Sequence, residues 1–340
     1  MNIPVLKDFD FQGKKVLVRC DFDVPLRQAQ GKPIVDDDSR IVECLPTINY
    51  LLEHGASLIL LGHIGRPEGK VVEELRMSPV AEKLKELSNV QCTIYNVQLG
   101  KFSAYKISEN IVLLENLRFD PREESNDEGF AKELANLGDF YVNEAFATSH
   151  RAHASIVGIP KLLPHCAGMH FTLEVENLSR VLENPKKPVV FVIGGAKPET
   201  KVAYIESFAR MADAVLVGGT LVRNRVRVGE NIIYAELTED GFDINQESID
   251  KFVNFIKNAG TVVWNGPMGK YEDERYENGT RQIAEAIGDC GGFRVVGGGD
   301  TIAALKKFEL IDKMDYVSTA GGAMLEFLSK GNLPGIEALI

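Results

Sequence analysis

Short runs of apolar, often β-branched residues recur along the chain, and most are followed within two residues by glycine, aspartate or asparagine. Runs of this length and composition are typical of strands buried on both faces of a parallel sheet. The pattern predicts such strands at 15–19, 57–61, 111–114, 140–142, 189–193, 214–217, 261–264 and 293–296.

Helical spacing of apolar residues appears between several of these runs, at 80–87, 202–211, 249–256 and 280–287. Alternation of strand and helix through both halves of the chain predicts an α/β fold with doubly wound parallel sheets. A further helix is predicted at 173–182, and Pro185 and Pro188 end it before the next strand begins. The chain has 340 residues, about twice the usual domain length, so we expect two domains that meet at this helix.

Composition narrows the class of protein. Apolar residues make up 44% of the chain and charged residues 26%, which are ordinary values for a folded protein. The net charge of −11 argues against binding of nucleic acid or of an anionic membrane. No signal peptide or membrane span is visible, and we expect reduced cysteines in a cytoplasmic protein at Cys20, Cys44, Cys92, Cys166 and Cys290.

Polar residues follow the predicted strands of the first half, where parallel sheets bind their ligands. These residues are Asp21, Asp23, His63, Arg66, Arg118, His150, Arg151 and His153, and Arg40 lies nearby in the chain. Guanidinium groups gathered at one sheet edge predict an anion site. The alternative for any single arginine is a surface ion pair, and for His150 and His153 we favour a structural role.

Glycines follow the predicted strands of the second half, at 194–195, 218–219, 266, 297–299 and 321–322. Gly297, Gly298 and Gly299 lie between a strand and a helix, which predicts a phosphate cradle at a helix N-terminus. Asp300 would suit Mg²⁺ beside the phosphates, although Asp300 or Thr301 could instead cap the helix. The P-loop, dinucleotide, serine-hydrolase and zinc-protease motifs are absent, and Lys197 and Lys201 are the lysines near the glycines.

Seven motifs in this order resemble the phosphoglycerate kinase family. They are Arg19-Cys20-Asp21-Phe22-Asp23-Val24-Pro25, Gly62-His63-Ile64-Gly65-Arg66-Pro67, Glu115-Asn116-Leu117-Arg118-Phe119, His150-Arg151-Ala152-His153-Ala154-Ser155, Gly194-Gly195-Ala196-Lys197, Trp264-Asn265-Gly266-Pro267-Met268-Gly269 and Gly298-Gly299-Asp300-Thr301. The resemblance implies two Rossmann-like domains joined by a hinge helix: a phosphoglycerate-binding domain at 1–165, the hinge at 166–183, a nucleotide-binding domain at 184–322, and a tail at 323–340 that returns to the first domain. It also implies closure of the two lobes about the hinge.

The resemblance further implies reversible phosphoryl transfer from 1,3-bisphosphoglycerate to ADP, giving 3-phosphoglycerate and ATP in glycolysis. The residues expected to bind the phosphoglycerate are Asp21, Phe22, Asp23, Arg40, His63, Ile64, Gly65, Arg66, Arg118 and Arg151. Those expected to bind ADP or ATP are Gly195, Lys197, Lys201, Gly218, Gly219, Asn265, Pro267, Glu272, Gly298, Gly299, Asp300 and Thr301. Arg40, Lys197 and Gly299 would act on the transferred phosphoryl group, and Asp300 would hold Mg²⁺.

This chain departs from the family pattern in two places that matter. Asp23 replaces a usual asparagine, and the stretch between Gly219 and Thr261 is shorter than in known members, with 220–224 closer to archaeal ones. Two alternatives therefore stay open: a related kinase with another nucleotide or acyl-phosphate substrate, and a catalytically silent nucleotide-binding protein. We expect no nucleic-acid or membrane partner, and a monomer, with a homodimer as the alternative.

Overall fold

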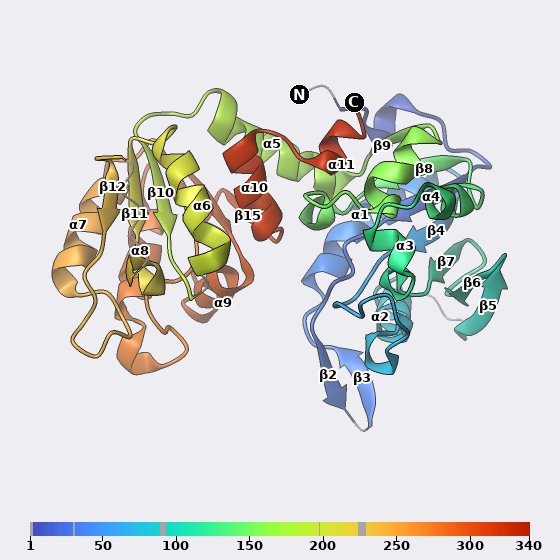
Figure 1. Cartoon of the computed structure of the whole chain (residues 1–340), viewed down its shortest axis with the longest axis horizontal. Coiled ribbons are helices and arrows are strands. Elements are labelled where there is room, and N and C mark those ends of the chain that lie inside the picture. The colour runs from blue at the N-terminus through green and yellow to red at the C-terminus, as the bar shows by residue number, and fades with distance from the viewer. Residues whose placement is uncertain (1–2, 30, 89–92, 197, 224–228) are drawn as a thin grey trace. The chain divides into compact units, whose positions relative to one another are not determined.

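The computed structural model describes residues 3–29, 31–88, 93–196, 198–223 and 229–340 (Figure 1). The chain divides into two compact units: unit 1 is Met1–Val175 with Asn332–Ile340, and unit 2 is Glu176–Gly331. Each unit is built on its own sheet. Within the described residues, no helix is long and apolar enough to cross a membrane.

A seven-stranded sheet in the order β5-β6-β7-β4-β1-β8-β9 forms the centre of unit 1. Its parallel strands are β1 (Lys15–Arg19), β4 (Ser57–Leu61), β7 (Ile111–Leu114), β8 (Phe140–Asn143) and β9 (His165–Ala167). Strands β5 (Tyr95–Leu99) and β6 (Phe102–Lys106) extend the sheet in antiparallel fashion. The sequence pattern does not predict β5 and β6, because they are partly exposed and lack a continuous apolar run.

The parallel strands of unit 1 end in register. Arg19 pairs with Leu61 on one side and with Asn143 on the other. The residues that follow β1, β4 and β8 therefore emerge at one edge of the sheet, where the sequence predicts ligand-binding groups. The helices of this unit are α1 (Ser39–Glu53), α2 (Ser78–Leu87), α3 (Pro121–Glu124), α4 (Glu128–Ala135) and α11 (Pro334–Glu337), and β2 (Leu26–Ala29) pairs with β3 (Lys32–Val35) in a separate antiparallel pair.

Unit 2 contains an all-parallel sheet in the order β12-β11-β10-β13-β14-β15. Its strands are β10 (Val189–Ile193), β11 (Ala214–Val217), β12 (Ile232–Tyr234), β13 (Thr261–Asn265), β14 (Phe293–Gly297) and β15 (Tyr316–Ser318). Its helices are α6 (Pro198–Ala209), α7 (Gln246–Lys257), α8 (Asn278–Asp289), α9 (Gly299–Lys307) and α10 (Gly322–Lys330), and Figure 1 shows α6 and α7 on opposite sides of β10, β11 and β12. The two α/β units with parallel strands confirm the predicted fold class.

Helix α5 (Met169–Glu183) carries the chain from unit 1 to unit 2, and the division between the units falls inside it. Its N-terminus is held by Glu144, whose buried carboxylate accepts hydrogen bonds from the backbone N–H groups of His170 and Phe171 at 3.1 Å each. The Thr47 hydroxyl donates to the same carboxylate at 2.6 Å. Burial raises the pKa of Glu144 to about 8, although these three donors favour the ionised form.

The returning segment of the chain is shorter than the tail predicted from residue 323. Residues of α10 belong to unit 2, where the Ser207 hydroxyl on α6 donates to the Ser329 carbonyl at 3.0 Å. Only Asn332–Ile340 belongs to unit 1, and there the Gly335 N–H donates to the Ser149 carbonyl at 2.9 Å. Leu333, Ile336 and Leu339 are buried, and the apolar area that they remove from water stabilises the returned segment.

Candidate active site

In unit 1, an ion pair lies directly after strand β1. The Arg40 guanidinium on α1 contacts the Asp21 carboxylate at 3.1 Å and donates to the Asp23 carbonyl at 3.1 Å. Asp21 is only 7% exposed, and its burial raises its pKa while Arg40 opposes that shift. Asp21 in turn raises the pKa of Arg40. The guanidinium is therefore held in one place at the sheet edge where the sequence predicts an anion site.

Asp23 organises the turn that follows strand β4. Its Oδ1 accepts a hydrogen bond from the Gly65 N–H at 2.8 Å, and its Oδ2 lies 3.8 Å from Nε2 of His63. Gly65 has a positive φ of 62°, which this turn requires and which glycine adopts without strain. An asparagine could make the same bond to Gly65 through its side-chain oxygen, so the Asp23 substitution preserves the turn.

Arg118 joins the same cluster from the segment after β7. Its guanidinium donates to the Gly65 carbonyl at 2.8 Å and lies 3.3 Å from the Glu124 carboxylate. Asn116 supports both segments, since its amide donates to the Ile64 carbonyl at 2.8 Å and its oxygen accepts from the Arg118 N–H at 3.1 Å. Burial lowers the pKa of Arg118.

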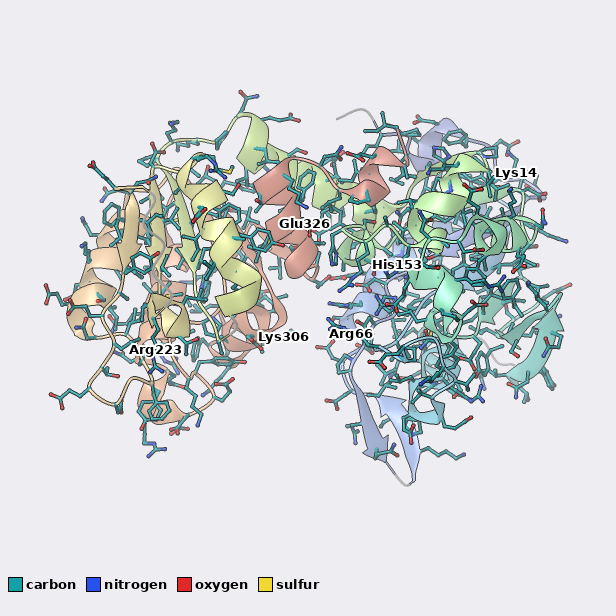
Figure 2. All side chains as sticks on the ribbon, in the orientation of Figure 1. Lys14, Arg66, His153, Arg223, Lys306 and Glu326 are labelled. Carbon is teal, nitrogen blue, oxygen red and sulfur yellow. The ribbon has the colours of Figure 1, made fainter. Side chains whose placement is uncertain are left out.

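The other predicted residues of unit 1 take different positions. Arg66 is exposed at the surface, while His153 lies inside the unit (Figure 2). Arg151 is half-buried and close enough to lower the pKa of His153. The side chains of Phe22 and Ile64 belong to the hydrophobic core, so the prediction that they contact a ligand is limited to their backbone atoms.

For His150 and His153 the sequence favours a structural role or a minor contact. His150 is half-buried, and the His153 side chain is only 7% exposed, 3.9 Å from the Glu123 carboxylate. Burial, reinforced by Arg118 and Arg19, lowers the pKa of His153 to about 3. The ring is therefore neutral near neutral pH, and its burial beside Glu123 is consistent with a structural role.

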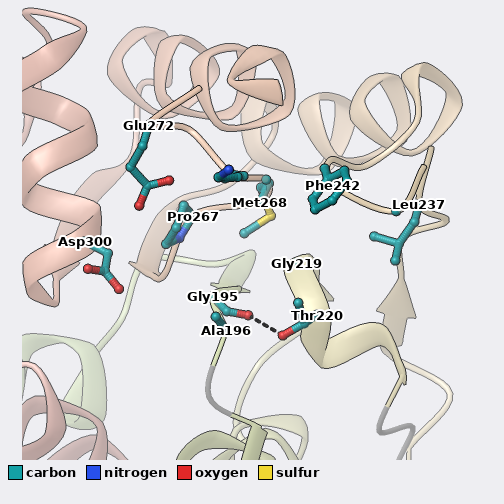
Figure 3. A pocket seen from close by; sticks show the side chains of 13 residues that line it. Gly195, Ala196, Gly219, Thr220, Leu237, Phe242, Pro267, Met268, Glu272 and Asp300 are labelled. Carbon is teal, nitrogen blue, oxygen red and sulfur yellow. Dashed lines mark hydrogen bonds between the residues drawn. The ribbon is translucent and has the colours of Figure 1, made fainter. Parts of the chain in front are cut away.

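Unit 2 contains a cavity of about 400 Å³ at the carboxyl ends of its strands (Figure 3). Figure 3 places the exposed carboxylates of Glu272 and Asp300 toward one end and the side chains of Leu237 and Phe242 toward the other. The remaining lining residues are Gly195, Ala196, Gly219, Thr220, Gly241, Pro267, Met268, Gly269 and Lys270. A mostly apolar cavity with a few polar groups at one end suits a ligand with a flat apolar part and a charged part.

The glycines of unit 2 have two different roles. A Cβ added to Gly218 would lie 2.4 Å from the Met268 sulfur, and one added to Gly219 would lie 2.8 Å from the Gly195 nitrogen. Contacts within the protein therefore require these glycines. At Gly299 an added Cβ would meet no atom within 4 Å, and its φ is an ordinary one. Packing does not require glycine there.

Three predicted ligand residues serve mainly to hold the loops around the cavity. The Thr301 hydroxyl is fully buried and accepts from the Gly266 N–H at 2.7 Å. Asn265 is also buried, and its amide donates to the Gly297 carbonyl at 2.8 Å. Lys201 donates to the Gly194 carbonyl at 2.8 Å. For Thr301 and Asn265 the structure favours a positioning role over the predicted side-chain contact with a ligand.

Asp300 lines the cavity and is the residue that the sequence predicts to hold a metal ion. Its carboxylate lies in the first turn of α9, just after Gly298, whose φ is 97°. Within the described residues, no group of three His, Cys, Asp or Glu side chains could hold a metal ion by itself. A single hard carboxylate beside a phosphate site fits Mg²⁺, which binds through one or two carboxylates, water and substrate phosphates. Lys197, predicted to act on the phosphoryl group, lies outside the described residues.

The sequence does not single out several residues that build these sites. In unit 1 they are Arg19, Glu123 and Ser155, which form a buried network described below. In unit 2 they are Leu237 and Phe242, which line the cavity from the shortened stretch. Arg19 and Ser155 belong to motifs that resemble the family, but only the folded chain shows that their side chains meet. Phe242 has no periodic signal around it.

Comparison with known proteins identifies the family of this chain. The family model for phosphoglycerate kinase matches residues 6–237 and 223–331. The chain belongs to the phosphoglycerate kinase family. It is 39% identical to the phosphoglycerate kinase of Roseiflexus sp. (strain RS-1), with 98% of each chain covered. The solved structure from Coxiella burnetii covers 99% of each chain at 35% identity and a TM-score of 0.83.

The phosphoglycerate kinase reaction is reversible phosphoryl transfer between 1,3-bisphosphoglycerate with ADP and 3-phosphoglycerate with ATP, a step of glycolysis. The chain is an enzyme of this activity, with ATP and ADP as its nucleotide substrates. The archaeal resemblance of residues 220–224 does not extend to the whole chain. The structure from Pyrococcus horikoshii is 28% identical with a TM-score of 0.82, below the identity to the bacterial relatives.

The comparisons also locate the shortened part of the chain. The alignment with the Roseiflexus enzyme spans 391 positions while this chain has 340 residues, so at least 51 aligned positions have no residue here. The two stretches matched by the family model meet and overlap at 223–237. A part of the family pattern is therefore missing next to Leu237, which lines the cavity of unit 2.

Proposed function

We propose that unit 1 binds the phosphoglycerate and that unit 2 binds the nucleotide and Mg²⁺. The observation that carries this proposal is the contrast between the groups at the carboxyl ends of the strands in unit 1 and those in unit 2. Unit 1 presents guanidinium groups on Arg40 and Arg118 and an imidazole on His63, which suit a small anion. Unit 2 presents a cavity with apolar walls and with Asp300 at one end, which suits a nucleoside and its phosphates.

On the phosphoglycerate side, Arg40 is the residue that we expect to face the transferred phosphoryl group. Asp21 and the Asp23 carbonyl fix its guanidinium before substrate binds, so little reorganisation is needed at the moment of transfer. Phosphoryl transfer depends mainly on positioning and on neutralising the charge of the equatorial oxygens. Arg66 and Arg151 would add positive charge to the same site, and their contribution is proposed from the resemblance.

On the nucleotide side, the N-terminus of α9 would receive the phosphates. The N–H groups of the first turn of a helix attract anions, and Gly299 leaves the backbone open to them. Asp300 would hold Mg²⁺, which, when bound, neutralises charge on the phosphate oxygens. Glu272 would bind the ribose, and Leu237 and Phe242 would contact the base. Lys197 is proposed to act on the phosphoryl group from the resemblance alone.

A pair of variants tests the division of labour between the units. Arg40→Lys keeps the charge but loses the planar fork, and we expect turnover to fall about 10²- to 10³-fold while the Kd for MgADP stays unchanged. Glu272→Gln should raise the KM for ADP and leave the KM for 3-phosphoglycerate unchanged. Tyr105→Phe is the matched control, because it removes a 2.8 Å hydrogen bond to Glu115 and Tyr105 is among neither set of predicted binding residues. Equal effects of both variants on both substrates would contradict the proposal.

The break in the family pattern supports a second candidate, a kinase with an altered preference for the base. The wall formed by Leu237 and Phe242 adjoins the missing part, and both side chains are apolar. The coupled assay with 3-phosphoglycerate and Mg²⁺, repeated with a panel of nucleoside triphosphates, decides between the candidates. Higher kcat/KM for a nucleotide other than ATP would establish the second candidate, and a clear preference for ATP would exclude it.

A further inference from the structure

Arg19 is the last residue of β1, and its side chain is completely buried beneath the polar residues of unit 1. All three nitrogens of its guanidinium make a hydrogen bond. Nε donates to the Ser155 hydroxyl at 2.9 Å, Nη1 donates to the Cys20 carbonyl, and Nη2 lies 2.9 Å from Nδ1 of His63. Burial of a charged group costs free energy, and here three hydrogen bonds of fixed direction offset that cost.

The carboxyl group of this network is Glu123 on α3, which is also completely buried; burial raises its pKa and Arg19 opposes that shift. Its carboxylate accepts from the Ser155 hydroxyl and, at 3.0 Å, from the Ser155 N–H. Tyr141 donates to the Ser155 carbonyl at 2.7 Å, which fixes the same residue from the other side. Ser155 thus joins the carboxylate to the guanidinium, and the network runs from Glu123 through Ser155 and Arg19 to His63.

This network determines which nitrogen of His63 carries the proton. Burial, with Arg19, Arg118, His153 and Arg40 nearby, holds the pKa of His63 well below its usual value, and Asp23 is the carboxylate on its other side. The ring is therefore neutral and has one donor nitrogen and one acceptor nitrogen. Because a guanidinium can only donate, Nδ1 must accept from Arg19. The proton lies on Nε2, the nitrogen that faces Asp23 at 3.8 Å.

We propose that Arg19 is a positioning residue for phosphoryl transfer, which fixes His63 as a neutral imidazole with its Nε2–H directed toward the phosphoglycerate site. The inference rests on the proposed function for the role of His63 in binding. Arg19 itself does not touch the substrate, since its side chain is fully buried. A neutral donor of fixed orientation can bind an anionic oxygen without having to gain a proton first.

Arg19→Lys tests the inference, because lysine retains the charge but lacks the planar fork whose three nitrogens reach Ser155, Cys20 and His63 at once. The chain has six histidines, so ¹⁵N-histidine labelling with His63→Gln for assignment isolates the His63 signals. In the unaltered protein we expect the ¹⁵N shifts of the Nε2–H tautomer. In Arg19→Lys we expect a mixture of tautomers and a KM for 3-phosphoglycerate about tenfold higher, as for the loss of one hydrogen bond to a charged group. The KM for ADP should not change.

Two further variants keep the test decisive. Ser155→Ala removes the acceptor for Arg19 Nε and leaves the Arg19 and Glu123 side chains in place. It should also give a mixture of His63 tautomers and a higher KM for 3-phosphoglycerate, which provides the test if Arg19→Lys does not fold. Tyr105→Phe is the control in the same unit, because it removes a 2.8 Å hydrogen bond to Glu115 outside the network. It should leave the His63 spectrum unchanged.

The outcomes separate the inference from the function on which it rests. An Nδ1–H tautomer in the unaltered protein, or an unchanged tautomer and KM in both Arg19→Lys and Ser155→Ala, overturns the positioning role. If instead His63→Gln binds 3-phosphoglycerate with unchanged KM, the placement of His63 in the phosphoglycerate site is wrong. The tautomer measurement needs no substrate, so the first failure is recognised independently of the second.

Discussion

Gly299→Ala should weaken nucleotide binding without weakening the fold. The added methyl group meets no protein atom within 4 Å, and the backbone at Gly299 has an ordinary φ. Residue 299 is the first residue of α9, where alanine loses less entropy on folding than glycine does. We therefore expect unit 2 to gain about 0.4–1 kcal/mol in free energy of unfolding, because the unfolded chain has fewer states to lose.

The effect on the ligand has the opposite sign. If a phosphate lies against the N-terminus of α9, the methyl group occupies part of its space and displaces it from one backbone N–H. Loss of one hydrogen bond to a charged group costs about 1.5–3 kcal/mol, which corresponds to a Kd for MgADP roughly 10- to 150-fold higher. Isothermal titration with MgADP measures the binding, and thermal unfolding of the same preparation measures the stability.

Two other glycine variants serve as controls. Gly291→Ala adds a methyl group in open space before the amino end of β14, so MgADP binding should remain as in the unaltered chain while the free energy of unfolding rises by the same amount of about 0.4–1 kcal/mol. Gly194→Ala places a Cβ 2.3 Å from the Pro267 carbonyl oxygen, so it should destabilise unit 2 by several kcal/mol, with or without nucleotide. Unchanged MgADP affinity in a folded Gly299→Ala protein would refute the phosphate cradle at α9.

Three further predictions concern pH, the metal ion and helix α5. His153 has a pKa of about 3 in the folded chain against about 6.5 when unfolded, so it supplies stability above pH 6.5 that is lost as the pH falls. Urea titrations measure the free energy of unfolding at pH 6.5 and at pH 5. Its decrease between these pH values should be about 2 kcal/mol larger for the unaltered protein than for His153→Gln, and equal decreases would exclude this linkage. Asp300→Asn should raise the Mg²⁺ concentration for half-maximal activity by about tenfold or more, and an unchanged Mg²⁺ titration would remove Asp300 from the metal site. Above the Glu144 pKa of about 8, Glu144→Gln replaces an acceptor oxygen at the start of α5 by a donor, so the free energy of unfolding in urea titrations should fall by about 1–3 kcal/mol. Full stability there would show that the three hydrogen bonds to Glu144 contribute little.

The amino-acid pattern was sufficient for the central strands. Strands β1, β4, β7, β10 and β11 have the predicted bounds, because each is an apolar run buried on both faces and ended by a change of residue type. The order of residues also placed Asp21, His63 and Arg118 at strand ends, where parallel neighbours bring them together. Sheet edges were not predictable in this way. Strands β5 and β6 are partly exposed, and pairing with a neighbour stabilises them more than their own composition does.

Local pattern therefore determined which residues stand at the ends of the strands, since alternation and apolar runs are properties of neighbouring residues. The tertiary structure decided what each of them does. Phe22 and Thr301 stand within ligand-binding motifs, yet their side chains are buried and serve packing or loop geometry. Gly218 and Gly299 have the same composition signal, but only the space around each Cβ position distinguishes a packing requirement from an open approach for a ligand. Burial, and the donors that meet a buried group, depend on residues distant in the chain, such as Arg19 and Ser155, and become fixed only when the chain has folded.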